Sequence, residues 1–593
     1  MKLQIPSQSN VILKQSNQST ILGSLYRTYN IDLQKDIGKV KVTKSLLVKS
    51  GIYSSTFGGG IGFAPHGIAT YQNQIWVLAG TKVWVGGNSP SDGLAVDATS
   101  GSPLLSTNNA DIKNFVGKLI VTNGSEIKSY DGAWTSRYTY GTQSNSLLEV
   151  QDDHIYFSYD GYKIGNLDSS FTSSTSGANT INLLMPGYII SFIKSDGTYL
   201  WIGLINNLGG NSDITYVYKW NGSLADVPQG KYIINSRSVL SCDIVNGIPH
   251  VMDGNGRLLV FNGVRFEEVA RLPIKDGLTL YNSYGANNQR GVHPNGMKYD
   301  AVNKELLIVV SNLNQMGTAN YDFPGGVWSY TQESGLIHKY SGSLQPIADS
   351  GTTNLTDYGH YNTCFGGAIG IIALTPTSGE KGRILYGMTV LAPGETTADY
   401  GTACLFTNDT ADTSQKYGFF ITPEVHSATV ADIWQKVYTM YKNLLASTDK
   451  IVVKFRTRKD TPTTAQVTWS DIDRITTSTD ISSYSQGDEV QLIQGNGSGK
   501  SFHIKSIIED NGDYLVILDD SMPSGVIGLT GIAEFSKWIK LGEVTQNDTQ
   551  EYKEMVCQHS NVSPMVQIKC SMQFTGDDEL YNLYLSSVPL IKE

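Results

Sequence analysis

Several short stretches of the chain carry residue types that do chemistry in other proteins. The glycine-rich run that ends in Lys500 and Ser501 resembles a phosphate-binding loop, in which backbone N–H groups and a following helix hold phosphate. The spacing does not fit, because the residue five positions before Gly499 is Gln494 rather than glycine. Residues 502–508 then alternate apolar and polar side chains, as a strand does. The sequence therefore predicts a glycine-rich β-turn here and no nucleotide site.

Two acidic turns invite a similar comparison. Asp253 opens a run that resembles a calcium loop, which needs oxygen ligands at positions one, three and five and a late glutamate. Position five is Arg257 and no suitably placed glutamate follows, so a hairpin turn is favoured. The run from Ser195 to Trp201 resembles the Asp-box of sialidase-type propellers, in which an Asp and a Trp lock a hairpin. Such boxes are structural, so neither run predicts a catalytic residue.

Glycoside hydrolysis would need two carboxyl groups about 5–10 Å apart. The candidates are Asp152, Asp153, Asp243 and Glu267, and the sequence alone brings no two of them together. The histidines form no metal-binding pair. The cysteines have no CxxC spacing and are expected to be scattered core residues: Cys242, Cys364, Cys404, Cys557 and Cys570. We therefore expect no catalytic, cofactor-binding or metal-binding residues and no cofactor.

Composition narrows the classes of function further. Only 17% of the 593 residues are charged, against roughly 25% in an average globular protein. The net charge is −10 and no long basic run occurs, which argues against a dedicated nucleic-acid groove. The most apolar run, Phe365 to Leu374, is shorter than the about 20 residues that span a bilayer. The N-terminus lacks the apolar stretch of a secretory signal, so we expect synthesis and assembly in a cytoplasm.

A short module recurs along the first two-thirds of the chain: an apolar strand, an aromatic residue, Asp or Asn, then Gly. The copies are Tyr130-Asp131-Gly132, Tyr159-Asp160-Gly161, Trp220-Asn221-Gly222, Phe261-Asn262-Gly263 and, more weakly, Tyr340-Ser341-Gly342. Asp-Gly and Asn-Gly favour two-residue hairpins. Units of about 40–50 residues are typical of propeller blades, and roughly seven would fit residues 51–407. A pair of β-sandwiches is the alternative, but it does not need one turn at a fixed place in each unit.

The remaining segments complete an all-β protein. Residues 1–50 form an N-terminal arm and lead-in strands, of which 1–20 are either disordered or ordered by docking on a neighbour. Residues 408–593 are predicted to form a β-sandwich, with a small β-unit inserted at 487–528. Residues 430–445 fit a helical stripe as well as a strand, and their β-branched and aromatic content favours a strand.

This order of parts resembles a family of tailed-bacteriophage virion proteins. The resemblance rests on the lead-in at 29–33 and 38–40, and on the later segments 450–458, Trp469, 535–539 and 566–570. It implies a structural component of the tail, nozzle or collar, around the head-to-tail junction. The matching positions look architectural, so the resemblance assigns no functional residue.

Three hypotheses follow. The first is a non-enzymatic virion protein, assembled in the host cytoplasm, whose partners are other virion proteins and copies of itself in a homo-oligomer. The second is a host-attachment protein whose long propeller loops, such as Gln315 to Gly325 and Glu395 to Tyr400, bind a surface glycan or receptor. The third is a propeller glycosidase with a pair of carboxylates at the mouth of the ring.

Overall fold

The computed structural model describes residues 27–29, 31–32, 40–43 and 46–48, and most of residues 65–589. The longest gaps in the second range lie at 281–290, 311–324, 342–364, 373–382 and 391–401. The predicted arm at 1–20 and almost all of the two loops assigned to host recognition fall outside the described residues. No helix in the described ranges is long and apolar enough to cross a bilayer.

Seven antiparallel sheets of mainly four strands follow one another along the chain. From inner to outer strand, blades 1 to 7 are: β5 (Gly67–Tyr71), β6 (Gln74–Ala79), β7 (Lys82–Gly87), β8 (Leu94–Val96); β9 (Asp111–Phe115), β10 (Lys118–Thr122), β11 (Glu126–Tyr130), β12 (Trp134–Thr139); β13 (Leu148–Gln151), β14 (His154–Tyr159), β15 (Lys163–Asp168), β16 (Ser173–Ser174), with β17 (Ile181–Asn182) also on β15; β18 (Tyr188–Ser195), β19 (Leu200–Asn206), β20 (Thr215–Trp220), β21 (Gly230–Ile234); β22 (Val239–Val245), β23 (Ile248–Asp253), β24 (Arg257–Phe261), β25 (Phe266–Arg271); β26 (Met297–Asp300), β27 (Glu305–Val310), β28 (Gly326–Thr331), β29 (Gly335–Ser341); β30 (Phe365–Ile372), β31 (Arg383–Val390), β32 (Thr402–Asn408) and β4 (Leu46–Val48).

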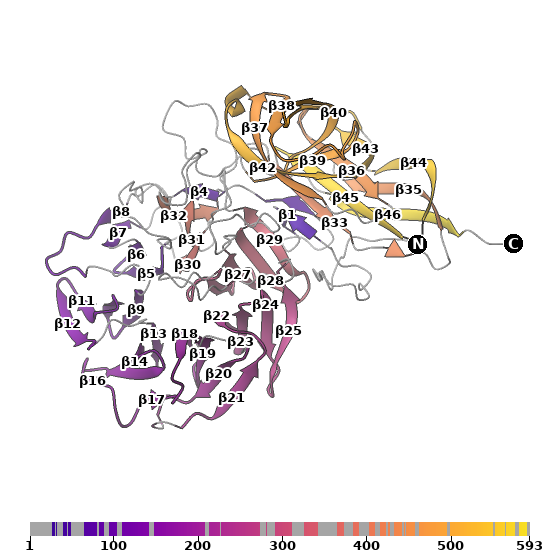
Figure 1. The fold of residues 1–593 in the computed structure, drawn as a ribbon. Helices are drawn as coiled ribbons and strands as arrows, with labels where there is room; N and C mark the ends of the chain where they lie inside the picture. Colours follow the sequence, from indigo (N-terminus) through magenta and orange to yellow (C-terminus); the bar gives the residue numbers. More distant parts are fainter. Residues whose placement is uncertain are drawn as a thin grey trace.

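The seven sheets close into a ring. Each inner strand contacts the next, from β5 through β9, β13, β18, β22, β26 and β30 and back to β5, and the blades surround a common axis (Figure 1). The last blade takes its outer strand from the N-terminal part of the chain, because β4 pairs with β32. The predicted β-propeller of about seven blades is confirmed, and the alternative of two sandwiches in this region is wrong.

Alternation along single strands holds neighbouring blades together. In β10, Leu119 and Val121 pack with Trp76 of blade 1, whereas Ile120 packs with Phe157 of blade 3. Side chains of a strand point alternately to its two faces, so one apolar run serves two interfaces. Fully burying such a side chain contributes about 1.5–3 kcal/mol. This explains why the blade strands have nearly continuous apolar sequences.

The aromatic-Asp/Asn-Gly turns do not all occupy the same place in a blade, as the sequence had predicted. Those at 130–132, 220–222 and 261–263 join the third and fourth strands. The turn at Asp160-Gly161 joins the second and third strands, and both of its residues have positive φ, 46° and 75°. In the turn at Asn262, by contrast, the side-chain oxygen accepts the N–H groups of Val264 and Arg265. The motif therefore marks hairpins by two different turn chemistries.

The predicted β-sandwich follows the propeller and packs two sheets over one core (Figure 1). Residues Val437 and Tyr441 belong to that core, and they lie on the central strand of the smaller sheet, so the strand prediction for 430–445 is confirmed. The larger sheet is β1 (Arg27–Tyr29), β33 (Lys416–Ile421), β45 (Met565–Phe574), β36 (Lys450–Arg456), β43 (Ile539–Thr545), with β34 (Val425–His426) on β45; the smaller is β44 (Tyr552–Ser563), β35 (Asp432–Tyr441), β46 (Leu580–Pro589).

The inserted unit is larger than the predicted 487–528. It is a closed barrel that runs from Thr463 to Ser536. The boundary prediction was wrong because Ala465, Val467 and Trp469 face the barrel core with the same alternation that a sandwich strand has. In order around the barrel, the strands are β37 (Thr463–Asp471), β38 (Arg474–Thr477), β41 (Asp513–Leu518), β40 (Ser501–Asp510), β39 (Glu489–Gln494) and β42 (Thr530–Ser536), and a single turn of 3-10 helix, η2 (Ser524–Val526), precedes β42.

The lead-in segment is not a separate arm domain, which corrects the predicted boundary at residue 50. Strand β1 joins the sandwich, β4 joins the propeller, and the pair β2 (Ile31–Asp32) and β3 (Lys41–Val42) lies between them in sequence. Ile31 and Val42 enter the sandwich core together with Ile337 of propeller strand β29. The Thr28 hydroxyl accepts the His338 N–H at 3.1 Å, and the Thr43 hydroxyl donates to the Lys339 carbonyl at 2.6 Å. The N-terminal segment thus joins the two domains.

This arrangement predicts a difference between two truncations. A chain that begins at Arg27 keeps every described strand, whereas a chain that begins at residue 51 loses β1 to β4 and leaves β32 and β33 each without a partner. We expect only the second truncation to lower the melting temperature, by more than about 4 °C for each 1 kcal/mol lost per small domain equivalent. Differential scanning calorimetry measures this, and equal melting temperatures would show that the ring does not depend on β4.

Candidate functional site

The glycine-rich run at 495–501 is a β-hairpin connection, as predicted. Strand β40 starts at Ser501, where a phosphate-binding loop would need a helix. Lys500 Nζ donates to the Ser521 carbonyl at 2.7 Å and lies 3.4 Å from Asp520 Oδ2. Gly499 has φ +92°, and a Cβ there would lie 2.6 Å from the Tyr417 carbonyl oxygen. The glycine therefore permits close packing of the barrel on the sandwich, and the lysine is engaged internally.

The two acidic turns are also structural. Both oxygens of Asp253 are occupied, because Oδ1 accepts the N–H groups of Asn255 and Arg257 and Oδ2 accepts Arg257 Nε at 2.7 Å. Asp196 has the geometry of an Asp-box: Oδ1 accepts the N–H of Tyr199 at 2.7 Å and Oδ2 accepts Trp201 Nε1 at 2.8 Å. Both runs are hairpin locks between adjacent strands.

The four candidate carboxylates lie on different elements. Asp152 and Asp153 form the turn between β13 and β14, and Asp243 is on an inner strand. Glu267 is on the outer strand β25, where Arg265 Nε donates to it at 2.9 Å and holds its pKa below the ordinary value. The fold therefore does not assemble Glu267 and Asp243 into a pair at the ring mouth.

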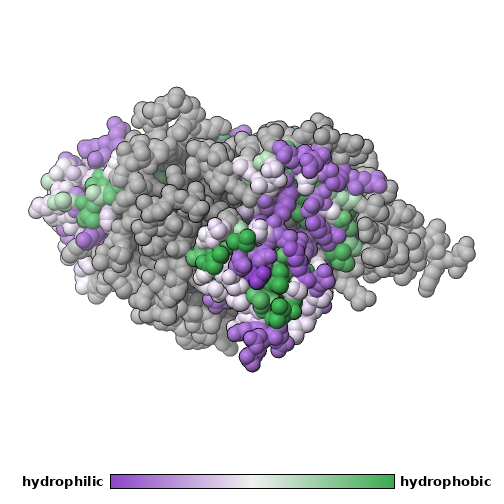
Figure 2. Space-filling view, turned by 90° about the horizontal axis from the view of Figure 1, so that it is seen from above, coloured by the Kyte–Doolittle hydropathy of each residue, from purple (hydrophilic) through white to green (hydrophobic). Residues whose placement is uncertain are grey.

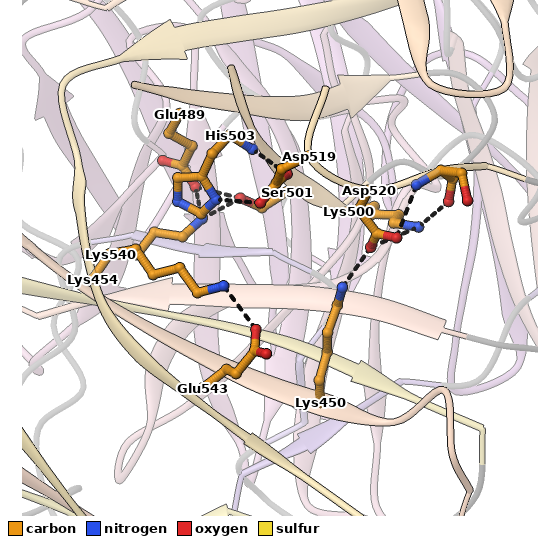
Figure 3. Close-up of polar contacts among 11 residues, drawn as sticks. Lys450, Lys454, Glu489, Lys500, Ser501, His503, Asp519, Asp520, Lys540 and Glu543 are labelled. Atoms are coloured by element: carbon orange, nitrogen blue, oxygen red, sulfur yellow. Dashed lines mark hydrogen bonds and ion pairs between the residues drawn. The ribbon is translucent and has the colours of Figure 1, made fainter. Parts of the chain in front are cut away.

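A buried ionic cluster that the sequence did not predict joins the barrel to the sandwich (Figure 3). Glu489 of β39 accepts hydrogen bonds from Lys454 of β36 and, at 2.8 Å, from Lys569 of β45. Ser501 and Ser536 donate to the same carboxylate at 2.6 Å and 3.2 Å. The side chains of Lys454, Glu489 and Lys569 are fully buried. We call these five residues the Glu489 cluster.

The Glu489 cluster holds two lysines against one carboxylate. Burial opposes ionisation of Glu489, but Lys454 and Lys569 outweigh it and hold the pKa of Glu489 well below its ordinary value. Burial lowers the pKa of Lys454 to about 8, aided by the like charge of Lys569 and opposed by Glu489. The lysine is enclosed and saturated with partners, so its lowered pKa describes packing between domains rather than a reactive amine.

A second set of contacts lies beside this cluster, nearer the solvent (Figure 3). Asp520 Oδ2 lies 2.5 Å from Lys450 Nζ of the sandwich. Asp519 accepts the backbone N–H of His503 at 2.7 Å. Burial opposes ionisation of Asp519, but these bonds with His503 prevail and lower its pKa to about 2. The barrel is thus fixed to the sandwich by polar contacts along one side.

Charged residues of alternating sign also gather at the axis of the propeller. Lys113, Glu149, Lys194, Asp243 and Lys298 belong to the inner strands of blades 2 to 6. Lys113 Nζ lies 3.1 Å from Glu149 Oε2, and Lys194 Nζ lies 3.6 Å from Asp243 Oδ1. Although Asp243 belongs to blade 5, it also acts on Lys113 of blade 2, and with nearer acids it outweighs burial to raise the pKa of that lysine. We call these five residues the axial layer.

One end of the axis is closed by the loop before β26. Asn295 Nδ2 donates to the His66 carbonyl at 3.2 Å and to Asp111 Oδ1 at 3.0 Å. The Asn295 carbonyl accepts the N–H of Ile369, and the Pro294 carbonyl accepts the Ser241 hydroxyl at 2.8 Å. A single loop therefore bonds to inner-strand segments of blades 1, 2, 5 and 7.

Comparisons with known proteins add no functional assignment. No known protein family matches the sequence, and no curated protein matches it. Among solved structures, the chain is similar to the WD40 β-propeller domain of Doa1, with 11% identity, a TM-score of 0.35, and coverage of 59% of this chain and 95% of that one. It is also similar to the N-terminal domain of Nup159 (10%, 0.37, 62% and 95%) and to the Neurospora crassa Pan2 WD40 domain (7%, 0.37, 64% and 98%). At these TM-scores the fold assignment rests on the strand pairing itself.

The Glu489 cluster predicts a large effect of one isosteric change. In Glu489→Gln the two lysines lose their only carboxylate, and breaking a buried ionic contact in this way costs about 3–5 kcal/mol. The matched control is Glu543→Gln, which removes a surface pair with Lys540 at 2.7 Å and is expected to change stability by less than about 0.5 kcal/mol. Guanidinium unfolding followed by tryptophan fluorescence compares them, and equal effects would contradict the assigned role.

The lowered pKa of Lys454 predicts a pH dependence. Between pH 8 and 10.5 the unfolded chain keeps the proton on this lysine while the folded chain releases it, so raising the pH through this range favours the folded state. We expect wild type to gain stability relative to Lys454→Met as the pH rises from about 8 to 10. Unfolding midpoints at both pH values test this, and a constant difference would mean that Lys454 keeps its ordinary pKa.

Proposed function

We propose that this protein is a non-enzymatic structural component of a bacteriophage virion, in the tail or head-to-tail region, that acts through contacts with other virion proteins and with copies of itself. The observation that carries the proposal is the joining of propeller and sandwich by the N-terminal segment. Strand β1 pairs with β33 and strand β4 pairs with β32, while Ile337 of the propeller packs in the sandwich core. A rigid two-domain block of this kind suits a repeated part of an assembly.

The fate of the chemistry-bearing residues supports the same function. Lys500, Asp253 and Asp196 each bond to the chain around them. Glu489 and Lys454, which have strongly shifted pKa values, are fully buried between barrel and sandwich. These groups stabilise hairpins and domain contacts, which is the use expected in a protein whose surfaces do the work.

The surface is also of a kind that assembly contacts cover. Seen from the barrel side, apolar residues gather in patches between hydrophilic ones (Figure 2). On the barrel, Ile508 and Ile527 are half exposed. With only 17% charged residues in the chain, little charge would have to be removed from water when copies or partners pack on such a surface.

Cryo-EM of a purified phage particle that carries this chain tests the proposal. We expect the propeller and sandwich to fit into symmetry-related density of the tail or its junction with the head, and mass spectrometry of the particle to detect the chain. Absence of the chain from purified particles would overturn the proposal. Turnover of a bacterial polysaccharide by the purified chain, abolished by Asp243→Asn, would favour a glycosidase instead.

A further inference from the structure

The axial layer is rich in hydrogen-bond donors, and its acceptors are already occupied. Glu149 pairs with Lys113, and Asp243 both pairs with Lys194 and accepts the N–H of Tyr299 at 2.6 Å. The neighbouring Asp111 carboxylate accepts the N–H groups of Ile112 and Leu148 as well as Asn295 Nδ2. Each lysine ammonium, by contrast, has three N–H donors. The free hydrogen-bonding capacity at the axis therefore belongs to the lysines.

Lys298 is the member of the layer without a carboxylate partner among the described residues. The alternation of charge stops at this residue, because the next inner strands around the ring, β30 and β5, carry no charged residue in their sequences. Asp243 attracts the Lys298 ammonium, but Lys194, burial and Lys113 outweigh that attraction and lower the pKa of Lys298. The like charges of Lys194 and Lys113 are thus close enough to destabilise this cation.

We propose that the axial layer binds a small oxyanion of the phosphate class, held by Lys298 together with Lys194 and Lys113. A multivalent oxyanion supplies the acceptors that the layer lacks, and it neutralises the like charges that now oppose one another. Chloride offers a single acceptor atom, so it fits three converging ammonium groups less well.

The layer is reachable from solvent. The side chains of Lys113 and Glu149 keep 23% and 16% of their exposure, and that of Lys194 keeps 8%. The Asn295 loop bonds to Asp111 and Ser241, which lie two residues before Lys113 and Asp243 on their strands. The loop therefore closes the axis on the side where the inner strands begin, and an ion would enter from the side of the turns between first and second strands.

The test measures binding of inorganic phosphate to the full chain by isothermal titration calorimetry, with sodium chloride added to keep the ionic strength constant. We expect saturable binding with one site per chain. Lys298→Met should weaken it about tenfold or more, as expected for the loss of one charge-assisted contact. The matched control is Lys82→Met, which removes an exposed lysine of the same propeller and should bind phosphate as wild type does. A parallel titration with sulfate shows whether the site accepts oxyanions as a class.

Melting temperatures keep the test valid if the variant is altered in other ways. Without phosphate, Lys298→Met should melt at or above the wild-type temperature, since it removes a cation from among like charges. Phosphate should then raise the melting temperature of wild type and Lys82→Met but not of Lys298→Met, and Lys298→Arg should retain binding. The proposal is overturned if wild type shows no saturable phosphate binding, or if Lys298→Met binds as tightly as Lys82→Met. Neither result bears on the virion role, which particle composition tests separately.

Discussion

The structure depends on one antiparallel pairing, that of β4 with β32. A ring of blades has two ends, and each end is an open sheet edge until the chain closes it. Here the closing strand comes from the N-terminal side, so the first blade and the last are held in the same ring by backbone hydrogen bonds. Because β1 of the same segment pairs with β33, the constraint that closes the propeller also fixes the sandwich beside it.

Buried charge is used in two different ways in this molecule. In the Glu489 cluster the carboxylate is saturated by two lysines and two hydroxyl groups, so only one arrangement of barrel and sandwich satisfies it. At the propeller axis the charges belong to separate blades and stay partly solvated. The first arrangement specifies how two domains pack, and the second leaves unused donors around a common axis.

Much of the fold could be predicted from the sequence because its information is local. Hairpins at Asp160-Gly161 and Asn262-Gly263 follow from the conformations that Asp, Asn and Gly allow, and their recurrence indicated blades. Strand β4 could not be predicted as a blade strand, because three residues, Leu46–Val48, carry no period. The barrel boundary failed at Thr463–Asp471, where inward residues alternate in the same way in a barrel and in a sandwich.

The two charge clusters depend on long-range contacts and were missed. Glu489 lies in an ordinary alternating strand, and nothing near it in sequence indicates that Lys454 and Lys569 meet it. A signal for the axial layer did exist. Lys113, Glu149, Lys194, Asp243 and Lys298 each interrupt an otherwise apolar first strand of a blade. Alignment of the blades by their first strands would have placed them in one ring.

The position of the closing strand also sets the order of events during synthesis. The partners of β4 and β1 are β32 and β33, which are neighbours in the sequence at Thr402–Asn408 and Lys416–Ile421. As the chain leaves the ribosome, the N-terminal strands must therefore wait until most of the propeller has been translated. Both partners then emerge almost together, so closure of the ring and the start of the sandwich become a single late step. A ribosome that stalls before this point would release a chain with open sheet edges, which are prone to pair with other chains.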